Sequence, residues 1–130
     1  MTERIQPEGW AEPRGYANGM RARGEIVAVA GQIGWNANRE LVSEDFIAQF
    51  AQALANVVTV VRTAGGRPED LVSLTLYVVD VKEYVGRRSE VGEAYRKIMG
   101  GHYPAMALVQ IGALVDPGAK VEIQGLAVLP

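Results

Sequence analysis

Two segments of the chain carry apolar residues at steps of three and four positions, the spacing that predicts an amphipathic helix. We expect the first helix to begin at Ser43, whose hydroxyl can cap a helix, and to end at Gly65-Gly66. Its apolar stripe consists of Phe46, Phe50, Leu54, Val57, Val58 and Val61. The polar side chains that fall mainly outside this stripe are Gln49, Gln52, Asn56 and Arg62. The second helix is predicted over 82–99, and its stripe consists of Tyr84, Val91, Tyr95 and Ile98.

The strands are predicted from the alternation of side chains between two faces. They are expected over 25–30, 71–79, 105–111 and 120–128, and Leu41-Val42 is a candidate for a further short extended piece. In the segment 71–79, one face carries Val72, Leu74, Leu76 and Val78. Residues 1–15 are rich in Pro, Glu and Gly, and they are predicted to form an irregular arm that enters a short strand or turn at 16–20.

The order of these elements predicts a mixed sheet in one domain that spans residues 1–130. Two long helical crossovers favour parallel strand pairs, whereas the short links at both ends favour antiparallel ones. The simplest packing places both helices on one face of the sheet. The other face is then left open, because Ile26, Ala28 and Ala30 point away from Val27 and Val29 and yet are apolar. With no third helix to cover that face, another copy of the chain is the best candidate.

Composition restricts the partners of the chain. The net charge is −2 and the basic residues are scattered along the sequence, so a nucleic-acid partner is disfavoured. The absence of cysteine excludes disulfides, thiolate nucleophiles and cysteine-based zinc sites. No apolar run approaches the ~18 residues of a membrane span, and no apolar signal segment follows the first residues. We therefore expect a cytoplasmic protein without a membrane partner.

Glu122 is the carboxylate that points most clearly to chemistry, because it lies in the middle of an otherwise apolar strand. A charge there is costly without a partner or a pocket, but an exposed place on an edge strand explains it equally well. His102 is the only histidine, and a lone histidine in a loop is more often a structural hydrogen-bonding group than a general base. Trp35 and Tyr77 fit either the core or the wall of a pocket. The segment 31–34 lacks the full spacing of a phosphate-binding loop.

Five segments, taken together and in this order, resemble the Rid family of reactive-intermediate deaminases, which is also called the YjgF family. They are Gly15–Asn18, Val29–Ile33, Leu71–Asp80, His102–Ala105 and Leu114–Ile123. The resemblance spans nearly the whole chain. It implies a chorismate-mutase-like α+β fold, in which two helices pack on one face of a mixed sheet. It also implies a homotrimer with a ligand cleft at each interface, and the hydrolysis of reactive enamines and imines without a metal or an organic cofactor.

The resemblance implies roles for particular residues. The pocket tyrosine of the family falls on Tyr16, the glycine at the strand end on Gly31, and the acid that holds the attacking water on Glu122. The arginine that clamps the substrate carboxylate falls on Met106, and an asparagine of the second helix falls near Gly92. A thioether cannot replace a bidentate guanidinium, and it makes a more apolar wall. The chain therefore resembles the subgroup without this arginine, and hydrolysis of 2-aminoacrylate is not carried over.

These residues lead to one favoured function and two alternatives. The favoured one is a divergent enamine or imine deaminase, a cofactor-free hydrolase that handles a small reactive metabolite. Its catalytic residues are Glu122 and Tyr16, and its substrate-binding residues are Gly31, Trp35, Tyr77, Met106 and Leu108. In one variant, Arg87 or Arg88 reaches the cleft and supplies the missing cation. The alternatives are a non-catalytic small-molecule-binding or regulatory trimer and, less favoured, an endoribonuclease or translation inhibitor directed at RNA.

Overall fold

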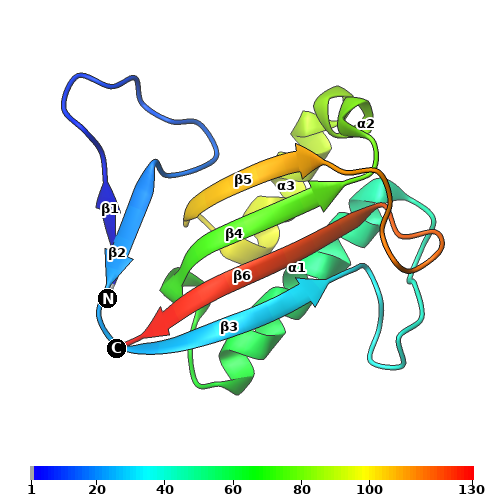
Figure 1. Cartoon of the computed structure of the whole chain (residues 1–130), viewed down its shortest axis with the longest axis horizontal. Coiled ribbons are helices and arrows are strands. Elements are labelled where there is room, and N and C mark those ends of the chain that lie inside the picture. The colour runs from blue at the N-terminus through cyan, green and yellow to red at the C-terminus, as the bar shows by residue number, and fades with distance from the viewer. Residues whose placement is uncertain (1) are drawn as a thin grey trace.

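The computed structural model describes residues 2–130. A hairpin of β1 and β2 comes first, and the remaining elements follow in the order β3-α1-β4-α2-α3-β5-β6 (Figure 1). The strands are β1 (Thr2–Ile5), β2 (Gly19–Ala22), β3 (Glu25–Gln32), β4 (Leu71–Val78), β5 (Ala105–Gln110) and β6 (Val121–Leu129). The helices are α1 (Phe46–Thr63), α2 (Val81–Gly86) and α3 (Arg88–Met99), and a short 3-10 helix at Pro68–Asp70 precedes β4.

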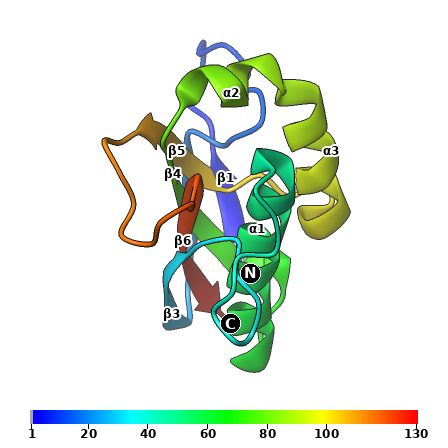
Figure 2. The ribbon, with the colours of Figure 1, turned by 90° about the vertical axis from the view of Figure 1, so that its right-hand side faces the viewer.

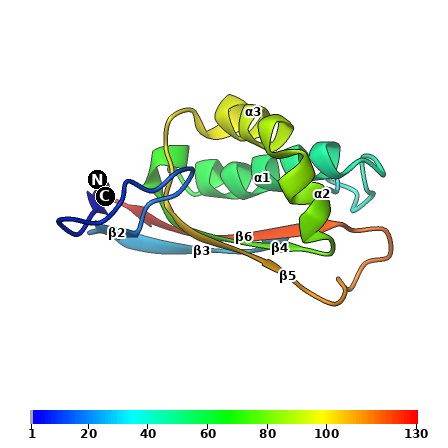
Figure 3. The same cartoon turned by 90° about the horizontal axis from the view of Figure 1, so that it is seen from above.

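The main sheet has the strand order β3-β6-β4-β5. β4 and β5 pair in parallel, whereas β6 runs antiparallel to both β3 and β4. The expected mixed sheet is therefore confirmed. Figure 3 shows α1 and α3 side by side on one face of the sheet, and Figure 1 looks onto the opposite face. The packing of the helices on a single face is confirmed as well.

The apolar core lies between α1, α3 and the sheet, and the stripe predicted for the first helix forms its centre. All six stripe residues of α1 are buried. The predicted face of β4 needs one correction, because the pairing of β4 with β6 shifts its register between Leu71 and Ser73. This irregularity puts Leu71 into the core beside Leu74 and leaves Val72 only half-buried. The extra residue re-aims one side chain, as a β-bulge does.

Two predicted elements differ from the structure. The segment 1–15 was expected to be irregular, but Thr2–Ile5 pairs antiparallel with Gly19–Ala22 as β1 and β2. The second helix was expected to be continuous, but it breaks at Arg87, whose backbone angles of φ −123° and ψ 28° are not helical. Figure 2 shows α2 and α3 as separate turns with different directions.

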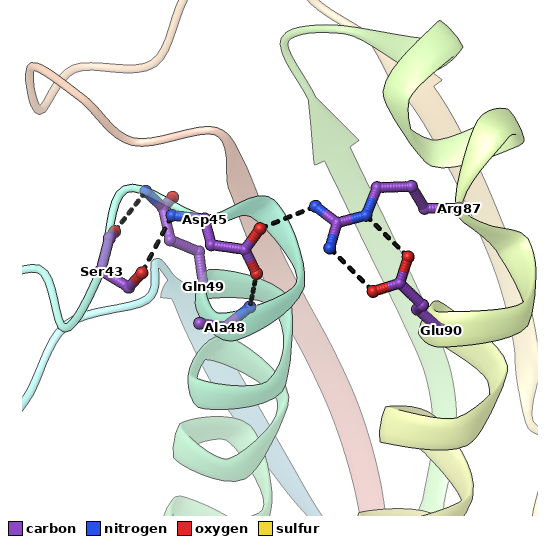
Figure 4. A network of polar contacts seen from close by, with 6 residues as sticks. All are labelled: Ser43, Asp45, Ala48, Gln49, Arg87 and Glu90. Carbon is purple, nitrogen blue, oxygen red and sulfur yellow. Dashed lines mark hydrogen bonds and ion pairs between the residues drawn. The ribbon is translucent and has the colours of Figure 1, made fainter.

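The break at Arg87 is held by two carboxylates (Figure 4). Its guanidinium donates to Asp45 at 2.7 Å and to both oxygens of Glu90 at 2.8 and 3.0 Å. Asp45, rather than the expected Ser43, is the N-cap of α1, and its carboxylate accepts the amide of Ala48. The hydrogen bond from Arg87, helped by that amide, holds the pKa of Asp45 below its usual value. The start of α1 is thereby tied to the start of α3.

Gln49 contradicts the expectation that it lies outside the buried stripe of α1, because its side chain is fully buried. Its amide nitrogen donates to the carbonyl oxygens of Ser43 and Gly118 at 2.9 and 3.0 Å, and its oxygen accepts the amide of Lys120 at 2.8 Å. One polar side chain thus satisfies three backbone groups in two loops. Buried polar groups of the backbone require such partners.

The face of the sheet away from α1 and α3 is named here the open face, and it is apolar as the sequence indicates. Ile26 is 68% exposed there, and Val109 and Leu126 are also exposed. Ala28 and Ala30 are exposed beside them on β3. Among residues 2–130, no element covers this face (Figure 3).

Replacing Gln49 by Ala is expected to lower the free energy of unfolding by about 3 kcal/mol, because three part-buried hydrogen bonds to the backbone are lost together with a fully buried side chain. Urea denaturation at neutral pH and a fixed protein concentration measures this change. Gln52→Ala is the matched control, since the Gln52 side chain bonds only to Asn56 on the same helix. A loss for Gln49→Ala no larger than that of the control would contradict the role assigned to Gln49.

Candidate functional site

Glu122 lies near the middle of β6 and points to the open face. Its neighbours Val121 and Ile123 are fully buried against the helices, and side chains alternate along a strand. Glu122 itself is half-buried, and its Cα partner on β4 is Tyr77. None of the hydrogen bonds or ion pairs formed within residues 2–130 involves its carboxylate. Glu122 is thus a carboxylate on an apolar surface with both oxygens available.

Gly31 lies directly beside this carboxylate. A Cβ atom built on Gly31 would lie 2.7 Å from the carboxyl carbon of Glu122, closer than non-bonded carbon atoms approach. The absence of a side chain at Gly31 is therefore what lets Glu122 extend over β3. The pairing of β3 with β6 is irregular between Val29 and Gln32, which places Gly31 inside this irregularity.

Tyr77 lies on the same face, but its hydroxyl turns away from Glu122. It donates to the Gln124 side chain at 2.9 Å. Directly paired residues on antiparallel strands share a face and lie close together. Tyr77 therefore forms the second wall beside Glu122, across from Gly31. Three of the residues predicted for the site, Gly31, Tyr77 and Glu122, are brought together by the structure.

Tyr16, Met106 and Leu108 form a second group on the other face of the sheet. Met106 is the Cα partner of the buried Leu74, so its side chain points toward the helices. Tyr16 is held at the edge of β5, because the adjacent amide of Ala17 donates to the Pro104 carbonyl at 3.0 Å. All three line a cavity of about 680 Å³ between β5 and the helices α2 and α3, named here the α3–β5 cleft.

The α3–β5 cleft also contains residues that the sequence analysis did not assign to a site. Three arginines line it, Arg14, Arg88 and Arg96, together with the small Gly92. The only available signal was the spacing of four between positions 88, 92 and 96, which puts them on one helical face. Of the two arginines considered for the cleft, Arg88 reaches it, whereas Arg87 is bound to Asp45 and Glu90 instead.

Stacked aromatic rings form part of the cleft wall. Tyr95 and Tyr103 lie with ring centroids 5.0 Å apart and planes 9° apart. Burial, with a smaller contribution from Tyr103, raises the pKa of the Tyr95 hydroxyl, which donates to the carbonyl of His102 at 2.7 Å. His102 in turn places Nε2 2.7 Å from the Leu71 carbonyl, where the ring must donate. The structural interpretation of His102 accounts for these contacts.

Trp35 belongs to neither group within one chain. It lies in the loop after β3. Its backbone carbonyl accepts a hydrogen bond from the Asn56 side chain at 2.9 Å, and its backbone forms an isolated antiparallel β-bridge with Leu41. Its ring is linked to the end of β3 through a long contact of 3.5 Å with the Gln32 side chain. The residues lining the α3–β5 cleft do not include it.

The two groups of candidate residues therefore occupy opposite faces of one sheet. Within a single chain the Glu122 carboxylate cannot reach the α3–β5 cleft, because it lies on the opposite face of the sheet and β4 separates its strand, β6, from β5. Among residues 2–130, no three His, Asp or Glu side chains lie close enough together to hold a metal ion. No helix in the same range has the length and apolar character of a membrane span.

The chain is similar to known proteins over most of its length. The family model described as endoribonuclease L-PSP matches residues 10–129. A 2-iminobutanoate/2-iminopropanoate deaminase of Salmonella typhimurium is 32% identical over 108 residues, which is 81% of this chain and 80% of that one. A RutC family protein of Haemophilus influenzae is 30% identical, over 76% of this chain and 77% of that one. The crystal structure of YyfB, a Rid-family protein of unknown function from Yersinia pestis, superimposes with a TM-score of 0.87 at 32% identity and covers 98% of both chains.

Replacing Gly31 by Ala is expected to displace the Glu122 carboxylate by about 1 Å, because the new Cβ would occupy space now held by that side chain. A crystal structure of the variant measures the displacement. The effect on unfolding is expected to stay below about 1 kcal/mol, since the displaced group is the free end of a flexible chain. Gly112→Ala is the matched control, because nothing lies within 4 Å of a Cβ at that position. An unmoved carboxylate would contradict the role of Gly31.

Proposed function

Because the chain belongs to the Rid (YjgF) family, whose family model is described as endoribonuclease L-PSP, we propose that it is a divergent imine or enamine deaminase. In this proposal, three copies of the chain form a trimer, and a small reactive metabolite is hydrolysed in each cleft between them. The observation that carries it is the Glu122 carboxylate, which forms no hydrogen bond or ion pair within residues 2–130 and extends over Gly31 on an apolar face.

Glu122 is proposed to act on water. An unpaired carboxylate beside apolar strands can hold a water molecule and accept its proton as the oxygen attacks a C=N carbon. The carbon–oxygen bond forms as the double bond between carbon and nitrogen becomes single, and the nitrogen takes a proton from a second group, which gives a carbinolamine. Glu122 then passes the proton it holds to the nitrogen, and the second group takes back the proton of the new hydroxyl. The carbon–nitrogen bond breaks and releases ammonia and a carbonyl product. Tyr16 is proposed to be this second group, since it lines the α3–β5 cleft and carries a hydroxyl.

A second subunit is proposed to complete the site. The Glu122 group and the Tyr16 group lie on opposite faces of one sheet, so they can meet only when the open face of one chain packs near the cleft of another. The exposure of Ile26, Val109 and Leu126 supports such packing, because it would bury an apolar surface. Gly31, Tyr77 and Trp35 would then line the side contributed by one subunit, and Met106 and Leu108 the side contributed by its neighbour.

The proposed substrate is not 2-aminoacrylate. The relative from Salmonella typhimurium is named for 2-imino acids. In this chain the position expected to clamp their carboxylate is Met106, which offers an apolar surface. The net charge of −2 likewise favours a small metabolite over RNA, despite the ribonuclease description of the family model.

The proposal predicts a trimer at micromolar concentration, with three times the mass of the 14.0-kDa chain in sedimentation or light scattering. Ile26→Glu is expected to shift the protein toward single subunits, because it puts a charge on the open face. Val60→Glu, on the exposed side of α1, is the matched control and is expected to leave the mass unchanged. A wild-type protein that sediments as a single subunit would rule out the shared cleft.

The proposal also predicts that Glu122→Gln lowers kcat/KM for imine hydrolysis by about 100-fold or more, because the amide cannot accept the proton of water. Imines are generated in place by an amino-acid oxidase, and the carbonyl product is followed over time. Glu44→Gln, an exposed acid outside both groups, is the matched control. Thermal stabilisation by such compounds without any turnover would contradict the enzymatic function and support the non-catalytic binding protein instead.

A further inference from the structure

The α3–β5 cleft concentrates positive charge in a protein that is acidic overall. Its charged lining residues are Arg14, Arg88 and Arg96, and no Asp or Glu side chain lines it. The net charge of the chain is −2. A concave surface lined by charges of one sign raises the local concentration of the opposite ion. The cleft therefore favours an anionic ligand, although its strand wall is apolar.

These three arginines are also free of acidic partners. No ion pair formed within residues 2–130 involves Arg14, Arg88 or Arg96. Arg87 provides the contrast, because it is adjacent in the chain and is held by two carboxylates. Other arginines on the surface lack an acidic partner too, but these three line one cavity together. Their N–H donors remain available to a ligand.

Two of the three guanidinium groups lie against residues that are not acidic. Arg88 lies over the Tyr84 ring, 5.9 Å from its centroid, in a cation–π arrangement. Arg96 folds over Gly92, and a Cβ atom built on that glycine would lie only 3.0 Å from its Nη1 atom. Because positions 88, 92 and 96 share one face of α3, the two guanidinium groups lie on the same wall of the cleft.

The opposite wall is apolar. Met106 and Leu108 project into the cleft from β5, and Tyr103 continues this surface. A ligand that fills the cavity thus meets cations on the helix side and apolar atoms on the strand side. The volume of about 680 Å³ falls within the range that accommodates a small organic molecule.

We propose that Arg88 and Arg96 of α3 together bind the carboxylate of a small organic acid whose apolar or aromatic body packs against Met106 and Leu108. The proposal rests on the proposed function in one respect, because it names the substrate class of the same cleft. It places the negative charge of the ligand at the helix wall and the carbon skeleton at the strand wall. An imine with an aromatic or branched aliphatic body fits this division, whereas 2-aminoacrylate has no such body.

Binding of unreactive compounds tests the proposal independently of any turnover. Phenylacetate, its neutral isostere phenylacetamide, acetate and inorganic phosphate are titrated into the full-length protein by calorimetry. Phenylacetate is expected to bind at least about 10-fold more tightly than phenylacetamide, because charged hydrogen bonds are lost in the amide. Acetate and phosphate are expected to bind more weakly than phenylacetate, because neither has an apolar body. Equal affinity for phenylacetate and its amide, or for phenylacetate and phosphate, would overturn the proposal.

Arginine variants locate the bound charge. Arg88→Gln and Arg96→Gln are each expected to weaken phenylacetate binding by about 10-fold or more, and Arg88→Lys is expected to weaken it less because the charge remains. Arg62→Gln, at an exposed position of α1, is the matched control. All three side chains are exposed, so thermal unfolding is expected to stay unchanged and to confirm that each variant folds. Wild-type affinity in the Arg88→Gln, Arg96→Gln double variant would refute the assignment.

The outcomes separate this inference from the proposed function. Carboxylate binding that depends on Arg88 and Arg96, without any imine hydrolysis, supports the inference and contradicts the proposed enzymatic function. Hydrolysis that depends on Glu122, with carboxylate binding unaffected by the arginines, supports the enzymatic function and contradicts the inference. Displacement of phenylacetate by an oligouridylate that binds more tightly would overturn the inference in favour of a nucleic-acid ligand.

Discussion

An apolar sheet with helices on one side only is the constraint on which the rest of this structure depends. The hydrophobic effect opposes leaving Ile26, Val109 and Leu126 in water, and no element in the part of the chain that the structure describes shields them. The same surface carries the Glu122 carboxylate, which would lose much of its hydration if that surface were covered. Any partner that covers the open face must therefore leave Glu122 a wet pocket or supply a polar group to it. An interface with an enclosed cleft satisfies both demands.

The two walls of the α3–β5 cleft differ in the chemistry that they offer to a ligand. In a wall that carried an arginine on β5, the strand would hold the charge of a ligand. Here Met106 gives the strand wall an apolar side chain, and α3 contributes the cations of Arg88 and Arg96. The position of α3 consequently matters for recognition as well as for packing. Arg87 ties the start of this helix to the cap of α1 through Asp45, so the arginine-bearing wall is fixed to the core by an ion pair outside the cleft.

Much of the fold could be predicted from local patterns, whereas the site could be predicted only in part. The stripe of α1 follows from spacing alone, because burial along a single helix face is periodic. The buried Gln49 could not be predicted in this way, since its partners Ser43, Gly118 and Lys120 are brought to it by loops distant in sequence. The pairing of β1 with β2 was missed for a related reason, because an arm rich in Pro and Gly gives no alternation. The convergence of Arg14 with Arg88 and Arg96 depends on where the N-terminal arm crosses β5, and no local pattern contains that information.

In α3, a side chain at position 92 and the guanidinium of Arg96 would need the same space. The guanidinium of Arg96 occupies the space into which a side chain at position 92 would grow, with only 3.0 Å between its Nη1 atom and a Cβ there. A side chain at 92 would therefore require the guanidinium of Arg96 to move by a few tenths of an ångström or more, as the free end of a flexible side chain can. The glycine at 92 thus sets how closely the cation of Arg96 lies along the helix, and a larger residue there would reorient that cation without disturbing the core.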